Sequence, residues 1–299
     1  MSGEFREQDW DLLIRRIKDG KCAPFLGAGA AYGVLPLGGD IAKAWAKEYG
    51  YPLEDASNLI SVSQYLAVKT DPIFPKEQIV EMFKKSPSPD LNDPLEPHNV
   101  LGGLPLPVYL TTNYDDFMTK ALARRKRDPN RILSRWNQWV KDYVSDNPTP
   151  FDKDPQYKPT VANPVVFHLH GYVPLAESLV LTEDDYMDFL LDMASDQEII
   201  PTQIRRTFTG STLLFLGYRI ADWNFRVLMK SFKGYMQRYT HFAVMRVPAA
   251  SEATKDEAQK YLTEYYADID VRVYWGEVKD FMAQLKERWD KSGDGGWPL

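Results

Sequence analysis

A short apolar run that leads directly into a loop of small residues decides the fold: APFLGAGAA at residues 23–31. An apolar run of this length is typical of a buried strand. Small residues after a first strand let backbone N–H groups approach a phosphate at the start of a helix, but they are equally typical of a tight turn. Tyr32 stands where the dinucleotide fingerprint has its third glycine, which disfavours an ordinary dehydrogenase.

Further apolar runs follow at residues 108–112, 165–169, 212–216, 242–247 and 271–274, and helical patterns separate them. Continuous apolar runs that alternate with helices are what a parallel sheet covered on both faces requires. We therefore expect an α/β fold with a doubly wound, mainly parallel, Rossmann-like sheet of at least five strands.

The length of 299 residues is compatible with one large domain, residues 1–299, interrupted by two insertions. Residues 37–100 carry more helical segments than a crossover needs, which predicts a helical lid over the end of the sheet. Residues 124–163 become rich in Pro, Asp and Lys, which predicts a surface insertion.

Composition limits the classes of partner. A formal charge of −6 and a pI near 5.4 disfavour nucleic acid as a partner, and the basic run at residues 124–127 is interpreted as a solvated helix end. The single cysteine, Cys22, excludes an internal disulfide and a multi-cysteine zinc site within this chain. No run of about 18 apolar residues occurs, so we expect a cytoplasmic protein without a membrane anchor.

Polar residues gather where the second predicted strand ends, at Thr112, Asn113 and Asp115. Open α/β sheets bind ligands at the carboxyl ends of their strands. Asn and Asp at this place also cap helices, because their side chains accept hydrogen bonds from free backbone N–H groups. Both interpretations remain open for this segment.

The third predicted strand ends in two histidines, His168 and His170, before Gly171. Histidines two apart on a strand share one face, so a metal pair is conceivable. No third ligand has a matching spacing, so we expect no metal. His168 is compatible with a core histidine, whereas His170 is better placed to face a crevice.

The fourth predicted strand ends in Gly217 and Tyr218, with Asp222 nearby at the start of the next helix. A glycine there permits close approach of a ligand to the backbone, and Asp222 is also a candidate helix cap. Each signal is moderate, but all of them converge on one crevice at the carboxyl end of the sheet.

These motifs together resemble the sirtuin-like superfamily, and within it the bacterial branch of antiphage-defence enzymes that degrade NAD. The resemblance covers roughly residues 21–224. It rests on Gly27-Ala28-Gly29-Ala30, Thr112-Asn113-Tyr114-Asp115, His170-Gly171, and Gly217-Tyr218 with Asp222. Two departures from deacylating sirtuins favour this branch: one cysteine cannot build their zinc module, and Leu37-Gly38-Gly39 replaces their Asp-Phe-Arg.

The resemblance implies NAD as substrate and cleavage of its nicotinamide–ribose bond. Asn113 would hold the nicotinamide ribose and a water, His170 would be the general base, and Asp115 would orient the site. Gly27, Ala28, Gly29, Ala30, Thr112, Gly217, Tyr218 and Asp222 would bind the dinucleotide. Ala31 replaces a serine common in the family loop. An imidazole with the ordinary pKa of about 6.5 would lose activity below about pH 6.

The resemblance also implies homo-oligomers and an activating or effector protein partner, since an unrestrained NAD hydrolase would harm its own cell. Three alternatives remain: a non-catalytic sensor of NAD or ADP-ribose, protein deacylation or ADP-ribosyl transfer, and hydride transfer. The missing zinc module weakens deacylation, and the incomplete glycine fingerprint weakens hydride transfer.

Overall fold

A parallel sheet of seven strands forms the centre of the molecule in the computed structural model, which describes residues 5–195, 199–218, 239–248 and 251–293. The strand order is β3-β4-β2-β1-β5-β6-β7. The strands are β1 (Cys22–Leu26), β2 (Val108–Thr111), β3 (Asn130–Leu133), β4 (Val165–His168), β5 (Thr212–Leu216), β6 (His241–Met245) and β7 (Val271–Trp275). Because β1 lies at the centre and later strands add on both sides, the predicted doubly wound parallel sheet is confirmed.

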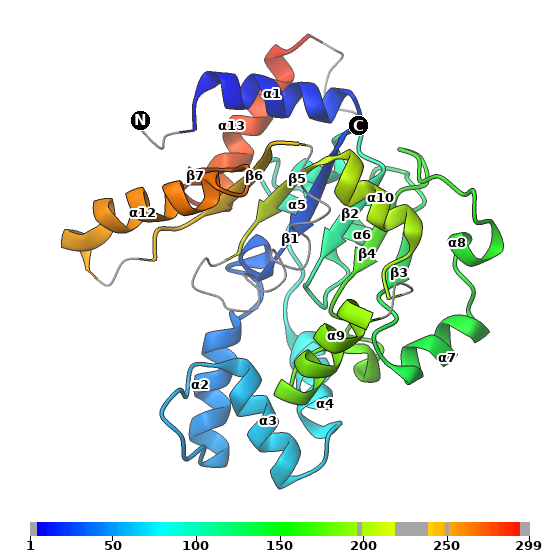
Figure 1. Cartoon of the computed structure of the whole chain (residues 1–299), viewed down its shortest axis with the longest axis vertical. Coiled ribbons are helices and arrows are strands. Elements are labelled where there is room, and N and C mark those ends of the chain that lie inside the picture. The colour runs from blue at the N-terminus through cyan, green and yellow to red at the C-terminus, as the bar shows by residue number, and fades with distance from the viewer. Residues whose placement is uncertain (1–4, 196–198, 219–238, 249–250, 294–299) are drawn as a thin grey trace.

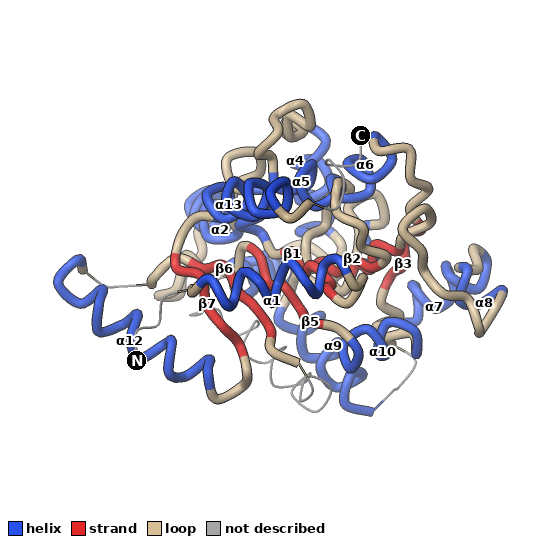
Figure 2. Tube along the Cα trace, turned by 90° about the horizontal axis from the view of Figure 1, so that it is seen from above, coloured by secondary structure: helices blue, strands red, loops and turns tan. Residues whose placement is uncertain are grey.

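Helices cover both faces of the sheet, as Figure 2 shows. The helices that accompany the sheet are α1 (Glu7–Lys18), α5 (Pro97–Gly102), α6 (Phe117–Arg124), α9 (Glu183–Ser195), α10 (Thr202–Gly210), α12 (Lys255–Ala267) and α13 (Val278–Lys291). One face packs against α1, α5, α6 and α13, and the other against α9, α10 and α12. None of the helices in the described ranges is long and apolar enough to cross a lipid bilayer.

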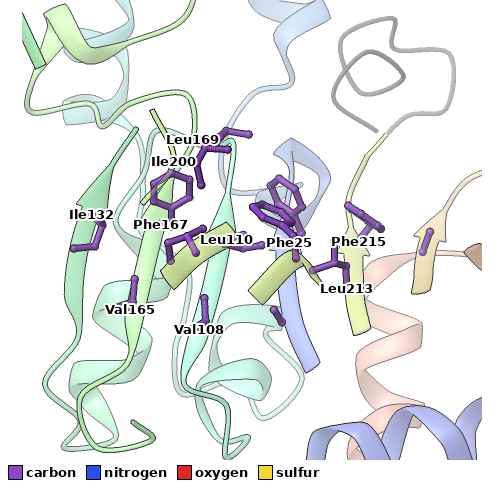
Figure 3. Packing of buried hydrophobic residues seen from close by; sticks show 14 of the residues in the cluster. Phe25, Val108, Leu110, Ile132, Val165, Phe167, Leu169, Ile200, Leu213 and Phe215 are labelled. Atoms are coloured by element: carbon purple, nitrogen blue, oxygen red, sulfur yellow. The ribbon is translucent and has the colours of Figure 1, made fainter. Parts of the chain in front are cut away.

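The central strands are buried on both faces because alternate side chains enter two different cores. Phe25 of β1 and Phe215 of β5 stand on one face with ring centroids 5.4 Å apart, and Figure 3 shows this packing. Leu26 and Leu216 enter the core on the opposite face. Strands buried on both sides lack polar alternation, so the continuous apolar runs in the sequence are explained.

The long insertion after β1 forms a group of helices below the sheet in the view of Figure 1: α2 (Gly38–Tyr49), α3 (Leu59–Lys69) and α4 (Phe74–Lys85). Trp45, Val62 and Ile79 form its core together with Leu179 and Leu181, from the segment after β4. A partly buried ion pair of 2.7 Å between Lys76 and Asp185 joins α4 to α9. The insertion is therefore fixed against the carboxyl end of the sheet, while its action as a lid stays a prediction.

The segment predicted as a surface insertion, residues 124–163, contains the edge strand β3, which the sequence analysis did not predict. β3 pairs in parallel with β4, from Asn130 opposite Val165 to Leu133 opposite His168. Asn130 and Arg131 are half-exposed, so the strand has only two buried residues. An edge strand of this kind lacks the apolar run that identified the other six. The remainder of the segment includes α7 (Gln138–Asp146) and α8 (Pro150–Lys153).

Candidate active site

A pocket of about 830 Å³ lies at the carboxyl ends of the strands and falls within the size range of ligand sites, roughly 300–1,000 Å³. Its walls come from the loops after β1, β2, β4, β5, β6 and β7 and from the helical insertion. The predicted residues on its surface are Ala28, Gly29, Thr112, Asn113, Asp115, His170, Gly217 and Tyr218. Gly27 and Ala30 are not on its surface, and Asp222 lies outside the described residues.

The loops after β1 and β5 meet at the point where the chain changes from one side of the sheet to the other. The Gly27 amide donates to the Leu216 carbonyl at 2.8 Å, and the Gly29 amide donates to the Gly217 carbonyl at 2.9 Å. Gly217 has φ +77°, and a Cβ there would lie 2.3 Å from the Ala30 nitrogen. Gly217 is therefore required by contact with the chain itself, whereas the sequence had indicated close approach of a ligand.

The Asn113 side chain is tied to the glycine loop rather than to a helix. Its Nδ2 donates to the Gly27 carbonyl at 3.0 Å, and its backbone amide donates to Thr111 Oγ1 at 2.9 Å. The N-cap of α6 is Asp116. The alternative that Asn113 caps the following helix is therefore wrong, and the residue stands at the pocket wall across the end of β2.

Thr112 and Tyr218 connect the loops after β2 and β5 with the end of β1. Thr112 Oγ1 lies 3.0 Å from the Tyr218 hydroxyl, which also donates to the Leu26 carbonyl at 3.0 Å. The Tyr218 ring also lies against the loop, because a Cβ on Gly27 would be 2.9 Å from it. These contacts hold the ends of β1, β2 and β5 in one rigid group.

Asp115 is buried at the pocket wall, and its Oδ1 accepts a hydrogen bond from the Phe117 amide at 3.0 Å. Asp115 precedes the N-cap, Asp116, and its side chain satisfies the backbone amide of the first residue of α6. Its Oδ2 is buried and has no hydrogen-bond partner among the described residues. Burial raises the pKa of Asp115, while the charge of His98 acts in the opposite direction.

His170 also lies at the pocket wall and is 7% exposed. Its ring makes edge-on contacts with Tyr186 and Phe189 of α9, at centroid distances of 5.3 and 5.2 Å. Its Nδ1 is 3.5 Å from the Tyr186 hydroxyl. Burial lowers the pKa of His170 to about 3, so the ring is neutral at neutral pH. This pKa differs from the ordinary value of about 6.5 on which the expected acid limb below pH 6 was based.

His168 has other neighbours and does not reach the pocket surface. β4 ends at His168, so the regular alternation does not extend to His170 and the two rings do not share one strand face. The His168 ring packs on Tyr172, and its Nδ1 is 3.3 Å from the Asn113 carbonyl. Burial and nearby Arg131 lower its pKa to about 3. His168 is the core histidine, directly behind Asn113.

Gly171 makes the turn that follows His170. Its φ is +95°, and a Cβ there would lie 2.2 Å from the Ser178 carbonyl oxygen. The Val180 amide donates to the His170 carbonyl at 3.0 Å. The glycine after the histidine therefore allows the chain to fold back and close the pocket wall.

The structure adds several pocket residues that the sequence did not indicate. Tyr32, Arg246 and Glu277 lie at its edge, where the Arg246 guanidinium pairs with Glu277 and stacks on the Tyr32 ring. Tyr186 approaches from α9. These residues lie far apart in the chain and belong to no local motif, so only the fold brings them together.

The N-terminus of α2 opens onto the pocket. Gly38 and Gly39 form its first turn and line the pocket, and no side chain caps its N-cap, Leu37. A helix N-terminus favours a negative group. In the described ranges, no group of three His, Cys, Asp or Glu residues is arranged to hold a metal ion.

Comparison with known proteins gives a consistent result. The model of the SIR2-like domain family matches residues 107–269. The chain is 20% identical to NAD(+) hydrolase ThsA of Acinetobacter baumannii (strain 532279), over 93% of this chain and 55% of that protein. It is 26% identical to NAD(+) hydrolase ThsA of Cytobacillus dafuensis, over 70% of this chain and 37% of that protein. It is 24% identical to NAD(+) hydrolase ThsA of Bacillus cereus (strain MSX-D12), over 87% of this chain and 48% of that protein. The chain thus spans about half the length, or less, of these relatives.

Proposed function

The chain belongs to the SIR2-like domain family, and from this premise we propose that it hydrolyses NAD at the nicotinamide–ribose bond. The products are nicotinamide and ADP-ribose. The names of its relatives, each an NAD(+) hydrolase, support the reaction class. We further propose that the reaction depletes NAD in the cytoplasm as part of antiphage defence.

One observation carries the assignment: Asn113 and His170 stand at the same wall of the pocket. β2 and β4 are neighbours, with Thr111 opposite His168, and both residues lie two positions beyond that pair. An amide and a neutral imidazole at the carboxyl ends of adjacent strands are suited to hold a ribose and a water molecule.

Loss of nicotinamide leaves positive charge on the ribose, so the site needs a base for the attacking water and negative charge nearby. His170 is the proposed base, since its lowered pKa keeps the ring unprotonated. Asn113, held by its bond to Gly27, positions the ribose and the water. Asp115 supplies a buried carboxylate at the same wall.

We propose that the dinucleotide extends from this wall across the switch point of the sheet. The loops holding Gly27, Ala28, Gly29, Ala30, Thr112, Gly217 and Tyr218 contribute its binding surface, and Asp222 stays a prediction. The uncapped start of α2, at Gly38 and Gly39, suits the negative pyrophosphate. Homo-oligomers and a protein partner that restrains the activity stay predictions.

The test is release of nicotinamide and ADP-ribose from NAD by the purified chain, alone and with candidate partner proteins. Equimolar formation of both products supports hydrolysis. Binding of NAD with no product in any mixture would instead identify the non-catalytic sensor. Transfer of ADP-ribose to a protein acceptor would be visible as nicotinamide released in excess of free ADP-ribose.

A further inference from the structure

A buried group behind the pocket wall contains Glu96, His98 and Asp115, and all three side chains are more than nine-tenths buried. Glu96 precedes α5, and its Oε2 accepts a hydrogen bond from the Asn99 amide at 2.6 Å. Its Oε1 lies 2.7 Å from His98 Nδ1. The carboxylate is thus fixed by a backbone donor on one oxygen and holds the imidazole with the other.

One polar atom of His98 and one of Asp115 have no hydrogen-bond partner among the described residues. His98 Nε2 and Asp115 Oδ2 are both buried, and neither has a hydrogen-bond partner among the described residues. Both residues contact Phe117: its ring meets the His98 ring with centroids 5.7 Å apart, and its amide donates to Asp115 Oδ1. A buried polar atom without a partner destabilises the fold, so two such atoms, on a basic and an acidic side chain that both contact Phe117, need an explanation.

The helices that carry this group are held closely together. A Cβ on Gly102 of α5 would lie 3.3 Å from the backbone of Ala121 in α6. His98 is in the first turn of α5, and Asp115 directly precedes α6. The close contact of the two helices therefore fixes the distance between the imidazole and the carboxylate.

We propose that His98 is a positioning residue of this site, which keeps the Asp115 carboxylate ionised and oriented at the pocket wall while Glu96 holds the imidazole. The assignment rests on the proposed hydrolysis, in which Asp115 supplies negative charge. His98 is not itself on the pocket surface, whereas Asp115 is.

Electrostatics agree with this arrangement. Burial acts to lower the pKa of His98, but the hydrogen bond and charge of Glu96 and the charge of Asp115 outweigh burial and raise it above its ordinary value. His98 in turn opposes the rise that burial causes in the pKa of Asp115. The other charged groups that act here are Asp116 on Asp115 and Lys279 of α13, which interacts with Glu96.

The first test measures the imidazole directly and needs no turnover. The chain has four histidines, so NMR titration of ring-labelled histidine can follow each one, with His98 assigned from His98→Gln. We expect the pKa of His98 to fall by about one unit or more in both Glu96→Gln and Asp115→Asn, because each change removes a negative charge beside it. An unchanged His98 titration in Asp115→Asn would overturn the proposal, whether or not the chain cleaves NAD.

The second test uses nicotinamide release. We expect His98→Gln to lower kcat about tenfold or more with little change in KM, since the interaction affects the reacting state more than binding. In the Asp115→Asn background, the same change should cost nothing further, because His98 acts through Asp115. Losses that multiply in the double variant would overturn the positioning role. Wild-type protein that releases no nicotinamide would refute the proposed function and leave the NMR result to decide the pairing.

Discussion

Gly29 and Gly217 pack backbone against backbone where the loops after β1 and β5 meet, so that a Cβ on Gly29 would lie 2.7 Å from the Gly217 Cα atom. The Gly29 amide also donates to the Gly217 carbonyl at 2.9 Å. The contact brings two segments nearly 190 residues apart in the chain to the floor of the pocket.

Gly217→Ala should destabilise the fold by about 3 kcal/mol or more and abolish NAD cleavage, because the new Cβ would meet the backbone of the neighbouring loop. Gly20→Ala is the matched control: Gly20 has φ +64°, similar to the +77° of Gly217, but open space around its Cβ position. That control should cost only about 1–2 kcal/mol from backbone strain. Chemical denaturation of both variants measures the difference, and equal losses would contradict the close contact.

Asn113→Ala should abolish nicotinamide release while costing only about 1 kcal/mol of stability, because one hydrogen bond to the Gly27 carbonyl is lost. Asn137→Ala is the control, since Asn137 caps α7 by accepting from the Val140 amide at 2.8 Å and lies away from the pocket. It should lose similar or greater stability and keep full turnover. Normal turnover by folded Asn113→Ala would refute the catalytic assignment.

His170→Ala should abolish turnover, and the wild-type rate should stay nearly constant from pH 7 to pH 5. Burial lowers the pKa of His170 to about 3, so the base remains unprotonated throughout this range. The measurement is kcat/KM against pH, with folding checked by circular dichroism. His168→Ala is the comparison, because it removes a core histidine that lies behind Asn113 and does not reach the pocket surface. Full turnover by His170→Ala would exclude it as the base, and a limb with a midpoint near pH 6.5 would show an imidazole with an ordinary pKa.

Acid should destabilise the protein partly through His168. Its pKa is about 3 when folded, against about 6.5 when unfolded. The unfolded chain therefore binds more protons between these values, and stability is lost as the pH falls through this range. From pH 7 to pH 5 this difference in His168 protonation lowers the free energy of unfolding by about 2 kcal/mol.

Denaturation at both pH values should accordingly show a smaller acid loss in His168→Gln than in the wild type. His98→Gln should show no such reduction, because the pKa of His98 is raised in the fold and its contribution is retained in acid. An equal acid loss in wild type and His168→Gln would mean that His168 is not buried in neutral form.

The helical insertion should be protected by NAD if it closes over the pocket. Lys43, Lys69 and Lys84 are exposed on α2, α3 and α4, which makes them suitable sites for trypsin. NAD should slow cleavage there, since residues of all three helices line the pocket. Exposed Lys260 on α12 is the control and should be cut at the same rate. Equal cleavage at all four positions with saturating NAD would argue against a lid.

The sequence identified the site only at positions where the backbone fixes the location of a side chain. Asn113 and His170 follow apolar runs, and strand ends of a parallel sheet meet at one edge, so their convergence was predictable. His98 was not identified, because nothing in its local sequence indicates that Phe117 and Asp115 lie beside it in the fold. Arg246 and Glu277 were missed for the same reason, since they come from the ends of two different strands.

The sequence by itself determined the doubly wound sheet and most of its strands, because strands buried on both faces require continuous apolar runs and their residues are close neighbours in the chain. It could not determine β3, whose position at the sheet edge needs only Ile132 and Leu133 to be buried. Only the tertiary structure showed that burial lowers the pKa values of His168 and His170. It also showed that a glycine is required at position 217 because the neighbouring loop leaves no room for a Cβ atom. Both depend on burial and on contacts between distant segments, which no local pattern contains.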